Sequence, residues 1–384
     1  MEDKYDIAII GAGPAGTACA LALHGSGLKV ALVDKSIFPR DKICGDAIPG
    51  PAFKAMDKIN PAWGRAMRAF TDKHEIRTGR MFSPNGKSIS LDWVTYAYNS
   101  KRIDFDNFLV ELVRKETATS ILENKRLKSI EVNNEGALCQ FQDETAIKAS
   151  IVIGCDGANS FVKRKLAEDD ISNEHACSAV RAYYSNVEGI QEGVNELHFF
   201  KDLLPGYFWI FPLENGWVNV GFGILQEKFG GKKLPMSLRH TMEDILQNRP
   251  QISERFKNSI LHQEIKSFGL PLGIEQKPIS GNRFMLCGDA ASLIDPLQGH
   301  GIDYAMWSGY FAAIQAVHCF KNGKFDASTM KNYDVQLFAK IGPELKRNTF
   351  ILKLISKAPW ILSLAIMLGQ NKKWTQRVVR FLKI

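Results

Sequence analysis

The segment YDIAIIGAGPAG, residues 5–16, decides how the N-terminal part of the chain folds. Its first six residues predict a buried strand, and the residues from Pro14 onward predict a helix that runs to His24. In GAGPAG the first glycine permits a tight turn, the second lets the backbone approach a pyrophosphate, and the third allows close packing of helix on strand. The N-terminus of the helix then presents free N–H groups and a partial positive charge. The segment therefore predicts a phosphate-binding turn.

An acidic residue follows the next predicted strand. That strand covers Lys29–Val33, and Asp34 stands at its end, 18 residues after Gly16. A carboxylate in this position accepts hydrogen bonds from ribose hydroxyls in dinucleotide-binding folds. The spacing predicts dinucleotide binding, with a glycine turn that serves only packing as the alternative. The residues assigned to this site are Gly11, Gly13, Pro14, Ala15, Gly16, Asp34 and Lys35.

Further along the chain, two buried strands flank an inserted sheet. Residues 150–153 and 283–287 are apolar runs followed by Gly or Asp, as in a parallel sheet. Residues 178–225 contain short β-branched and aromatic stretches broken by Gly and Pro, which predict an antiparallel sheet. Helices are expected at 233–247, at 301–320 and in the C-terminal tail. The predicted class is α/β: a Rossmann-type dinucleotide-binding domain with an inserted antiparallel β-sheet substrate domain and a C-terminal helical tail.

These expectations divide the chain into three parts. The dinucleotide-binding domain is predicted to be discontinuous, and the substrate domain is predicted to interrupt it. The predicted ranges are 1–75, 95–170 and 278–325 for the first domain, 76–94 and 171–277 for the second, and 326–384 for the tail.

Composition bounds the class of protein. The chain has 384 residues, of which 45% are hydrophobic, enough for one large unit or two interleaved domains. Its seven cysteines form no CxxC pair, and an odd, irregular set favours reduced thiols over a disulfide framework. No signal peptide is visible before the first strand, so a cytoplasmic protein is expected. No metal site is predicted.

Charge is concentrated in the tail. The net charge is +8, and residues 340–384 contribute +9 because they include ten Lys and Arg residues and only one acid, Glu344. Apolar residues such as Phe350, Leu354 and Trp360 alternate with these charges, which favours a helix on a membrane surface over a nucleic-acid site. The uncharged run 358–370 is too short to span a bilayer. Ordinary C-terminal helices packed on the body are the alternative to a peripheral position at the inner face of the membrane.

Four later motifs resemble those of the FAD-dependent oxidoreductases with the para-hydroxybenzoate hydroxylase fold, which is glutathione-reductase-like. They are RIDFDNFL at 102–109, GCDGANS at 154–160, GDAA at 288–291 and PLQGHGI at 296–302, in the order found in that family. The resemblance implies that FAD is the bound dinucleotide. The further cofactor-binding residues that it implies are Arg40, Cys44, Gly45, Arg102, Asp156, Gly157, Gly288, Asp289, Pro296, Gly299, Gly301 and Ile302.

Two more segments resemble the geranylgeranyl reductase family. They are KICG at 42–45 and PGYFWIFP at 205–212. The resemblance implies an enzyme that reduces C=C bonds of an isoprenoid or other polyunsaturated lipid by hydride transfer from reduced FAD. In a strand Tyr207, Trp209 and Phe211 share one face, so they are expected to line an apolar cavity over the flavin. The alternative is that the three rings form the core face of the sheet.

The candidate catalytic residues are not ranked by the sequence. Cys44 is expected near the flavin, where it gates the cofactor or shapes the pocket, with a buried inert thiol as the alternative. His300 lies between Gly299 and Gly301 and is a candidate to orient the flavin or move a proton, with an ordinary loop histidine as the alternative. Tyr207 is a second candidate proton donor. The proposed catalytic set is Cys44, Tyr207, Trp209, Phe211 and His300.

Other functions share these motifs. A flavin-dependent monooxygenase acting on an aromatic or lipid substrate uses the same fold and cofactor. A halogenase has a W-x-W-x-I-P signature that resembles 207–212, although Tyr207 and Phe211 depart from it. A membrane-surface scaffold that keeps a flavin for structure only is the non-enzymatic reading. Because the sequence has no second complete glycine fingerprint, the electron donor is expected to be NAD(P)H bound transiently or a redox protein.

Overall fold

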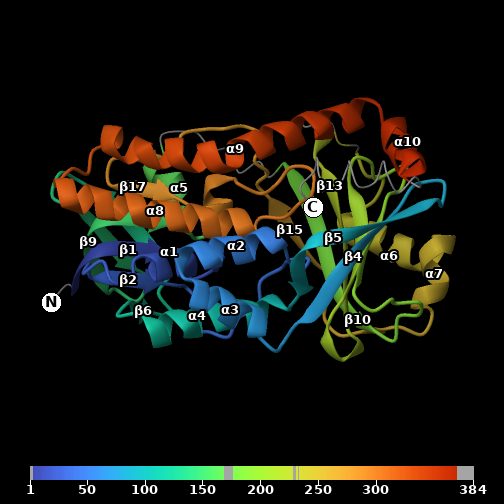
Figure 1. Cartoon of the computed structure of the whole chain (residues 1–384), viewed down its shortest axis with the longest axis horizontal. Coiled ribbons are helices and arrows are strands. Elements are labelled where there is room, and N and C mark those ends of the chain that lie inside the picture. The colour runs from blue at the N-terminus through green and yellow to red at the C-terminus, as the bar shows by residue number, and fades with distance from the viewer. Residues whose placement is uncertain (1–2, 168–175, 228–230, 232, 370–384) are drawn as a thin grey trace.

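The computed structural model describes residues 3–167, 176–227, 231 and 233–369, and these form two sheets joined side by side (Figure 1). The first sheet has the strand order β16-β17-β9-β1-β2-β6, and the hairpin β7-β8 extends it beside β9. Its strands are β1 (Asp3–Ile10), β2 (Val30–Val33), β6 (Ser120–Leu122), β7 (Leu127–Val132), β8 (Ala137–Phe141), β9 (Ala146–Gly154), β16 (Ser280–Gly281) and β17 (Phe284–Leu286).

Parallel pairing explains the apolar runs of this sheet. β1 pairs in parallel with β2 on one side and with β9 on the other, and β17 pairs in parallel with β9. Strands covered on both faces carry apolar side chains at every position, and all four residues of β2 are buried. The βαβ unit and the two later buried strands are therefore as predicted.

Several helices pack around α1, which lies against the first sheet (Figure 1). α1 packs against α8 and α4, and it also contacts β1 and β2, the strands on either side of the glycine turn. The helices of this part are α1 (Pro14–Ala22), α2 (Gly50–Ile59), α3 (Pro61–Ala69), α4 (Arg102–Glu116), α5 (Phe161–Leu166) and α8 (Ile302–Asn322), with a short 3-10 turn at Gly288–Ala291.

The second sheet has the order β14-β10-β13-β12-β11-β4-β5-β3, with β15 also paired to β10. Its pairings are antiparallel except that β11 runs parallel to β4, which differs from the purely antiparallel sheet expected. β4 forms a hairpin with β5 but is far from β11 in the sequence, so no hairpin fixes its direction relative to β11. The strands are β3 (Ala47–Ile48), β4 (His74–Phe82), β5 (Ser88–Asn99), β10 (Cys177–Ser185), β11 (Val194–His198), β12 (Tyr207–Pro212), β13 (Val218–Leu225), β14 (Ile260–Leu261) and β15 (Lys266–Leu270).

One face of this sheet holds a second hydrophobic core. Phe208, Ile210 and Phe222 are buried there beneath α6 (Leu238–Asn248) and α7 (Pro250–Phe256). Side chains alternate along a strand, so residues 207, 209 and 211 point to the opposite face. The core face of β12 is therefore not the face that carries Tyr207, Trp209 and Phe211.

The C-terminal region is partly built into the first core. The first half of α9 (Ala327–Lys357) buries Met330, Tyr333 and Leu337 in that core, and the Tyr333 hydroxyl donates to the Leu286 carbonyl at 2.6 Å. α10 (Trp360–Leu368) instead packs Ile366 against β5 of the second sheet. The predicted tail thus begins as a structural helix, and residues 370–384 lie outside the described part.

The close contact between α1 and α8 gives a first prediction. A Cβ added at Gly309 of α8 would lie 2.2 Å from the Ala15 carbonyl oxygen. This oxygen is a backbone atom, so it can move only if α1 or α8 shifts. We expect Gly309→Ala to lower the free energy of unfolding by about 1–3 kcal/mol, because overpacking outweighs the gain in helix propensity. Denaturant unfolding of the FAD-loaded protein measures this change.

Gly342→Ala in α9 is the matched control. Its Cβ would lie 2.7 Å from the amide nitrogen of the flexible Gln276 side chain and at an ordinary contact distance of 3.6 Å from the Phe338 Cβ. This variant is expected to leave stability unchanged or to raise it by up to about 1 kcal/mol. Equal effects of the two substitutions would contradict the close contact between α1 and α8.

Candidate active site

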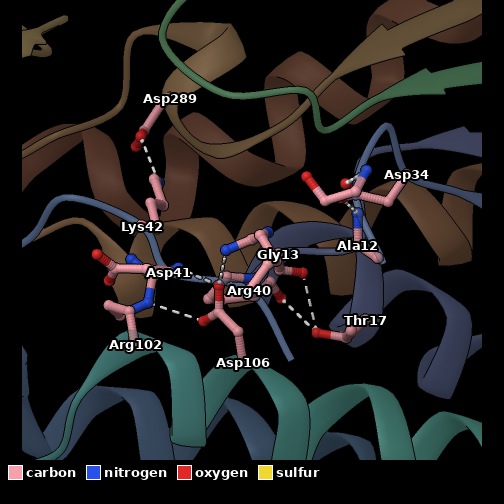
Figure 2. A network of polar contacts seen from close by, with 12 residues as sticks. Ala12, Gly13, Thr17, Asp34, Arg40, Asp41, Lys42, Arg102, Asp106 and Asp289 are labelled. Atoms are coloured by element: carbon pink, nitrogen blue, oxygen red, sulfur yellow. Dashed lines mark hydrogen bonds and ion pairs between the residues drawn. The ribbon is translucent and has the colours of Figure 1, made fainter. Parts of the chain in front are cut away.

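The glycine turn sets the position of α1 against the first sheet (Figure 2). A Cβ at Gly16 would lie 1.8 Å from the Gly11 carbonyl oxygen, so only glycine lets the helix approach so closely. The Ala12 N–H donates to Asp34 at 2.8 Å, and the Ser36 N–H donates to the other Asp34 oxygen at 2.9 Å. Asp34 therefore fixes the turn from the end of β2.

Positive charge gathers where α1 begins. Pro14, Ala15 and Gly16 are buried in its first turn, and no side chain of the described residues caps this N-terminus. The Arg40 guanidinium lies 3.7 Å from the place where a Cβ would stand on Gly13. Uncapped N–H groups and a guanidinium together suit a pyrophosphate.

A buried ion triad holds that guanidinium. Asp106 of α4 accepts a bidentate pair of hydrogen bonds from Arg102, both at 2.7 Å, and a third from Arg40 at 2.8 Å (Figure 2). Burial acts to raise the pKa of Asp106, but the two guanidinium groups hold it below its usual range. Burial acts to lower the pKa of Arg102, and Asp106 outweighs this, so that its pKa is raised. The triad is charged at all physiological pH values and carries one net positive charge.

The GD motif is joined to the same loop. Asp289 accepts from the Lys42 ammonium at 3.0 Å, so the loop after Arg40 reaches the 3-10 turn that follows β17 (Figure 2). Gly288 adopts φ +58° at this point. The predicted residues Gly288 and Asp289 therefore lie opposite the loop that bears Lys42 and Cys44.

A buried carboxylate shapes the loop before α8. Asp295 accepts from the N–H groups of Leu297 and Gln298, at 2.9 and 2.6 Å, and from the Asn348 amide at 2.6 Å. The loop then enters α8 through its N-cap residue, Gly301, which makes no side-chain capping bond. The predicted residues Pro296, Gly299, Gly301 and Ile302 all belong to this loop and the helix start.

His300 is paired in the same loop. Its Nδ1 lies 2.7 Å from an Asp303 carboxylate oxygen in the first turn of α8. Burial acts to lower the pKa of His300, but the Asp303 charge outweighs it, and Asp295 and Glu344 add to this, so the pKa rises to about 9. His300 is therefore an imidazolium at neutral pH, paired with Asp303 at the N-terminus of α8.

The three predicted aromatic residues form one row on β12. Neighbouring ring centroids, from Tyr207 to Trp209 and from Trp209 to Phe211, are both 6.2 Å apart. The Tyr207 hydroxyl donates to the Gln298 carbonyl at 2.7 Å, and a Cβ at Gly45 would lie 3.5 Å from the Phe211 ring. The row therefore faces the KICG loop and the loop before α8.

Asp156 has a different local role. Its carboxylate accepts from the Ser160 hydroxyl and from the N–H groups of Phe161 and Val162, at 2.6 and 3.1 Å. These bonds cap the N-terminus of α5. The carboxylate of the predicted DG motif is thus used to order its own loop, while Gly157 adopts φ +79° beside it.

Several polar residues at the site were not foreseen. Asp46, Tyr183 and Asn219 are buried together where the loop after Arg40 meets the second sheet, and Arg181 lies fully buried beside them. Asp46 stands directly after the KICG motif, and that adjacency was the available signal. The strand residues carry no local signal, because their partners lie far away in the sequence.

Two open hollows lie away from these motifs. Both are lined by residues of β4, and the second also by residues of β5; their volumes are about 340 and 590 Å³, and charged and polar residues such as Glu75 and Arg77 line them. Their lining does not suit an apolar chain.

The residues described above fit FAD. The uncapped turn and Arg40 suit its pyrophosphate, Asp34 its ribose, and Lys42 with Asp289 its polyol. A Rossmann-type sheet with this site defines an FAD-dependent oxidoreductase. Residues 4–336 match the family model described as an FAD binding domain, and the chain belongs to that family.

Curated relatives agree with this assignment. The chain is 29% identical over 364 residues to a digeranylgeranylglycerophospholipid reductase of Methanococcus vannielii, covering 92% of this chain and 88% of the relative. It is 28% identical over 324 residues to a menaquinone reductase of Mycobacterium tuberculosis, covering 82% and 76%.

Solved structures share the fold. A geranylgeranyl bacteriochlorophyll reductase-like protein of Thermoplasma acidophilum superposes with a TM-score of 0.84 at 22% identity, covering 99% of this chain and 96% of that one. A mutant of the halogenase PltM in complex with FAD gives a TM-score of 0.76 at 17% identity, covering 92% of this chain and 76% of that one. The predicted fold class, the FAD cofactor and the resemblance to geranylgeranyl reductases are confirmed.

The His300 pair gives a prediction that depends on pH. Because the folded-state pKa of about 9 exceeds the ordinary value of 6.5, the pair stabilises the fold fully below pH 6.5 and loses this effect as the pH rises through 9. We expect His300→Gln to lower the free energy of unfolding at pH 6 by about 1–3 kcal/mol, and by less at pH 10. Denaturant unfolding at several pH values measures this, and a difference that does not change with pH would contradict the charged pair.

Proposed function

We propose that this protein reduces C=C bonds of an isoprenoid or other polyunsaturated lipid. The observation that carries the proposal is the aromatic row of β12, which faces the KICG loop and the loop before α8. The names of relatives that act on digeranylgeranyl lipids and menaquinone, both of which carry isoprenoid chains, support the same substrate class.

The residues divide the work of such a reaction. When bound, reduced FAD supplies the hydride. Tyr207, Trp209 and Phe211 hold the apolar chain and exclude water, because an isolated alkene reacts only when closely aligned in a dry site. His300 holds a proton on its imidazole at neutral pH and is our first candidate for the proton that the second carbon requires.

Tyr207 is a weaker candidate for the proton donor. Burial raises the pKa of its hydroxyl well above the usual value, and that hydroxyl already donates to the Gln298 carbonyl. Releasing a proton from it would leave a buried phenolate. Its hydrogen bond instead ties the aromatic row to the loop before α8.

A monooxygenase or halogenase is the second candidate function. The fold shared with the halogenase favours it, since the same reduced flavin can meet oxygen there instead of an alkene. Anaerobic incubation separates the two chemistries. A reductase gives a product heavier by hydrogen without oxygen, whereas a hydroxylase or halogenase forms product only when oxygen is supplied.

We also propose that the protein works at a membrane surface. Phe350 and Leu354 on α9 and Trp360 and Leu364 on α10 are exposed, at 68%, 40%, 65% and 38%. Exposed lysines alternate with them, namely Lys346, Lys353 and Lys357. Apolar side chains with interleaved cations suit the surface of an anionic bilayer. No single described helix is long and apolar enough to cross a bilayer, and α9 with α10 passes that test only as a pair bent by 112°.

Substitution of Trp209 tests the aromatic row. Trp209→Ala is expected to keep bound FAD but to lower turnover of the lipid substrate by about 10–100-fold, because the chain loses its alignment. Trp209→Phe keeps an apolar ring and is expected to retain more turnover than Trp209→Ala. Flavin absorbance and mass spectrometry of extracted lipids measure the two effects. Loss of FAD from Trp209→Ala, with the fold intact, would show that the row does not line the substrate side.

Membrane binding is tested by co-sedimentation with liposomes of anionic and of neutral lipids. Replacing Phe350 and Trp360 with Ser is expected to weaken partitioning by about tenfold or more, because each ring loses its burial in the interface. Binding is expected to fall at high salt. Val335→Ser, at a residue that is also exposed on α9, is the matched control and is expected to bind normally. Absence of binding to anionic liposomes at low salt would retire the proposal.

A further inference from the structure

A buried carboxyl group links the KICG loop to the aromatic row. Asp46 is fully buried one residue after Gly45, in a backbone conformation with φ +65°. Its Oδ2 accepts from the Tyr183 hydroxyl at 2.7 Å and from the Asn219 amide at 2.8 Å. Its Oδ1 is equally buried but has no hydrogen-bond partner among the described residues. Burial of an acidic group with one unpaired oxygen costs folding free energy, so its retention calls for an explanation.

Asn219 carries the link onward. Its amide nitrogen donates both to Asp46 and to the Cys44 carbonyl, each at 2.8 Å. Because both acceptors face the nitrogen, the amide oxygen is fixed on the other side, where it accepts from the Trp209 indole N–H at 2.9 Å. One side chain therefore joins the carboxyl group, the loop and the indole.

We infer that Asp46 is a positioning residue, whose ionised carboxylate sets the Trp209 indole and the Cys44 loop through Asn219. The inference rests on the proposed function, in which Trp209 lines the substrate site. A charged acceptor makes shorter and stronger hydrogen bonds than a neutral one. Protonation of Asp46 weakens the bonds from Tyr183 and Asn219 and thereby loosens the wall of the site.

Each element packed against Asp46 brings charged, titratable or polar groups close to it. The loop itself brings Asp41 and Cys44, α4 with its N-cap brings Lys101 and Arg102, β10 brings Arg181 and Tyr183, and β13 brings the neutral Asn219. The Arg181 guanidinium also donates to Asp41 at 3.1 Å and to the Lys42 carbonyl at 3.3 Å, so it clamps the loop.

The ionisation of Asp46 falls within an accessible pH range. Burial raises its pKa to about 6, against the lowering effects of Arg181, Tyr183, Asn219 and Arg102. The carboxylate is therefore charged above pH 6 and becomes neutral as the pH falls through 6. The hydrogen-bonded arrangement of Asp46, Asn219 and Trp209 is therefore expected above pH 6.

The indole N–H of Trp209 reports this change directly. In FAD-loaded protein labelled with ¹⁵N-tryptophan, the indole signal missing from Trp209→Phe identifies Trp209. We expect this signal to shift with a midpoint near pH 6 between pH 5 and 8. The shift should vanish in Asp46→Asn, which keeps the acceptor and the shape but cannot ionise. In Tyr183→Phe the midpoint should rise, because a hydrogen bond that lowers the pKa is lost.

Asp334→Asn is the matched control. Asp334 is also buried with a raised pKa, but it lies on α9 and accepts from the Ile279 N–H. This variant should leave the Trp209 titration unchanged. A Trp209 signal that does not titrate, or one that still titrates near pH 6 in Asp46→Asn, overturns the inference. These NMR titrations do not depend on turnover, so the failure of the proposed function is detected separately, by the absence of any reduced lipid.

Turnover supplies the second readout. In the wild-type protein kcat should fall as the pH decreases through 6, whereas in Asp46→Asn it should be low and flat over this range. FAD affinity should change less than kcat, because the Asp46 carboxylate bonds to Tyr183 and Asn219 and not to the residues assigned to the pyrophosphate. A wild-type pH profile retained in Asp46→Asn would contradict the positioning role.

Discussion

The buried triad of Arg102, Asp106 and Arg40 is the interaction on which the site depends. A carboxylate with no exposed surface is stable only when its charge and its lone pairs are satisfied, and here two guanidinium groups do both. The bidentate Arg102 bonds fix the carboxylate on α4, and the remaining bond holds Arg40 near the start of α1. The positive charge of the phosphate site is thus set by a helix that is remote from it in the sequence.

The loop from residue 40 to residue 46 connects the triad to the GD motif and to the second sheet. At its start Arg40 belongs to the triad, and Lys42 then reaches the GD motif. Asp41 meets Arg181 of the second sheet, and Asp46 meets Tyr183 there. Charged contacts at both ends explain why a short irregular segment can be held between two sheets. Cys44 and Gly45 are placed by this loop and not by a helix or strand of their own.

The sequence revealed what is encoded locally. The βαβ unit was visible because its glycines, its apolar strands and Asp34 follow one another at short spacing. The network of Asp46 was not visible, since Tyr183 and Asn219 lie 137 and 173 residues away and look like ordinary strand residues. The parallel pairing of β11 with β4 is likewise a long-range contact with no local signature. Burial of α9 in the first core also depends on tertiary packing, which its mixed composition did not indicate.

Helix α9 determines how far the C-terminal part of the chain can be shortened. It is a single rod of 31 residues, with Tyr333 anchored beneath the flavin-side sheet and Asn348 bonded to the carboxylate that shapes the loop before α8. Its last turns carry the exposed Phe350 and Leu354. A shortened protein that begins its deletion at residue 326 would therefore lose part of its interior and the support of that loop. A deletion that starts beyond Lys357 would leave the rod in place and would remove α10, whose Ile366 packs against β5.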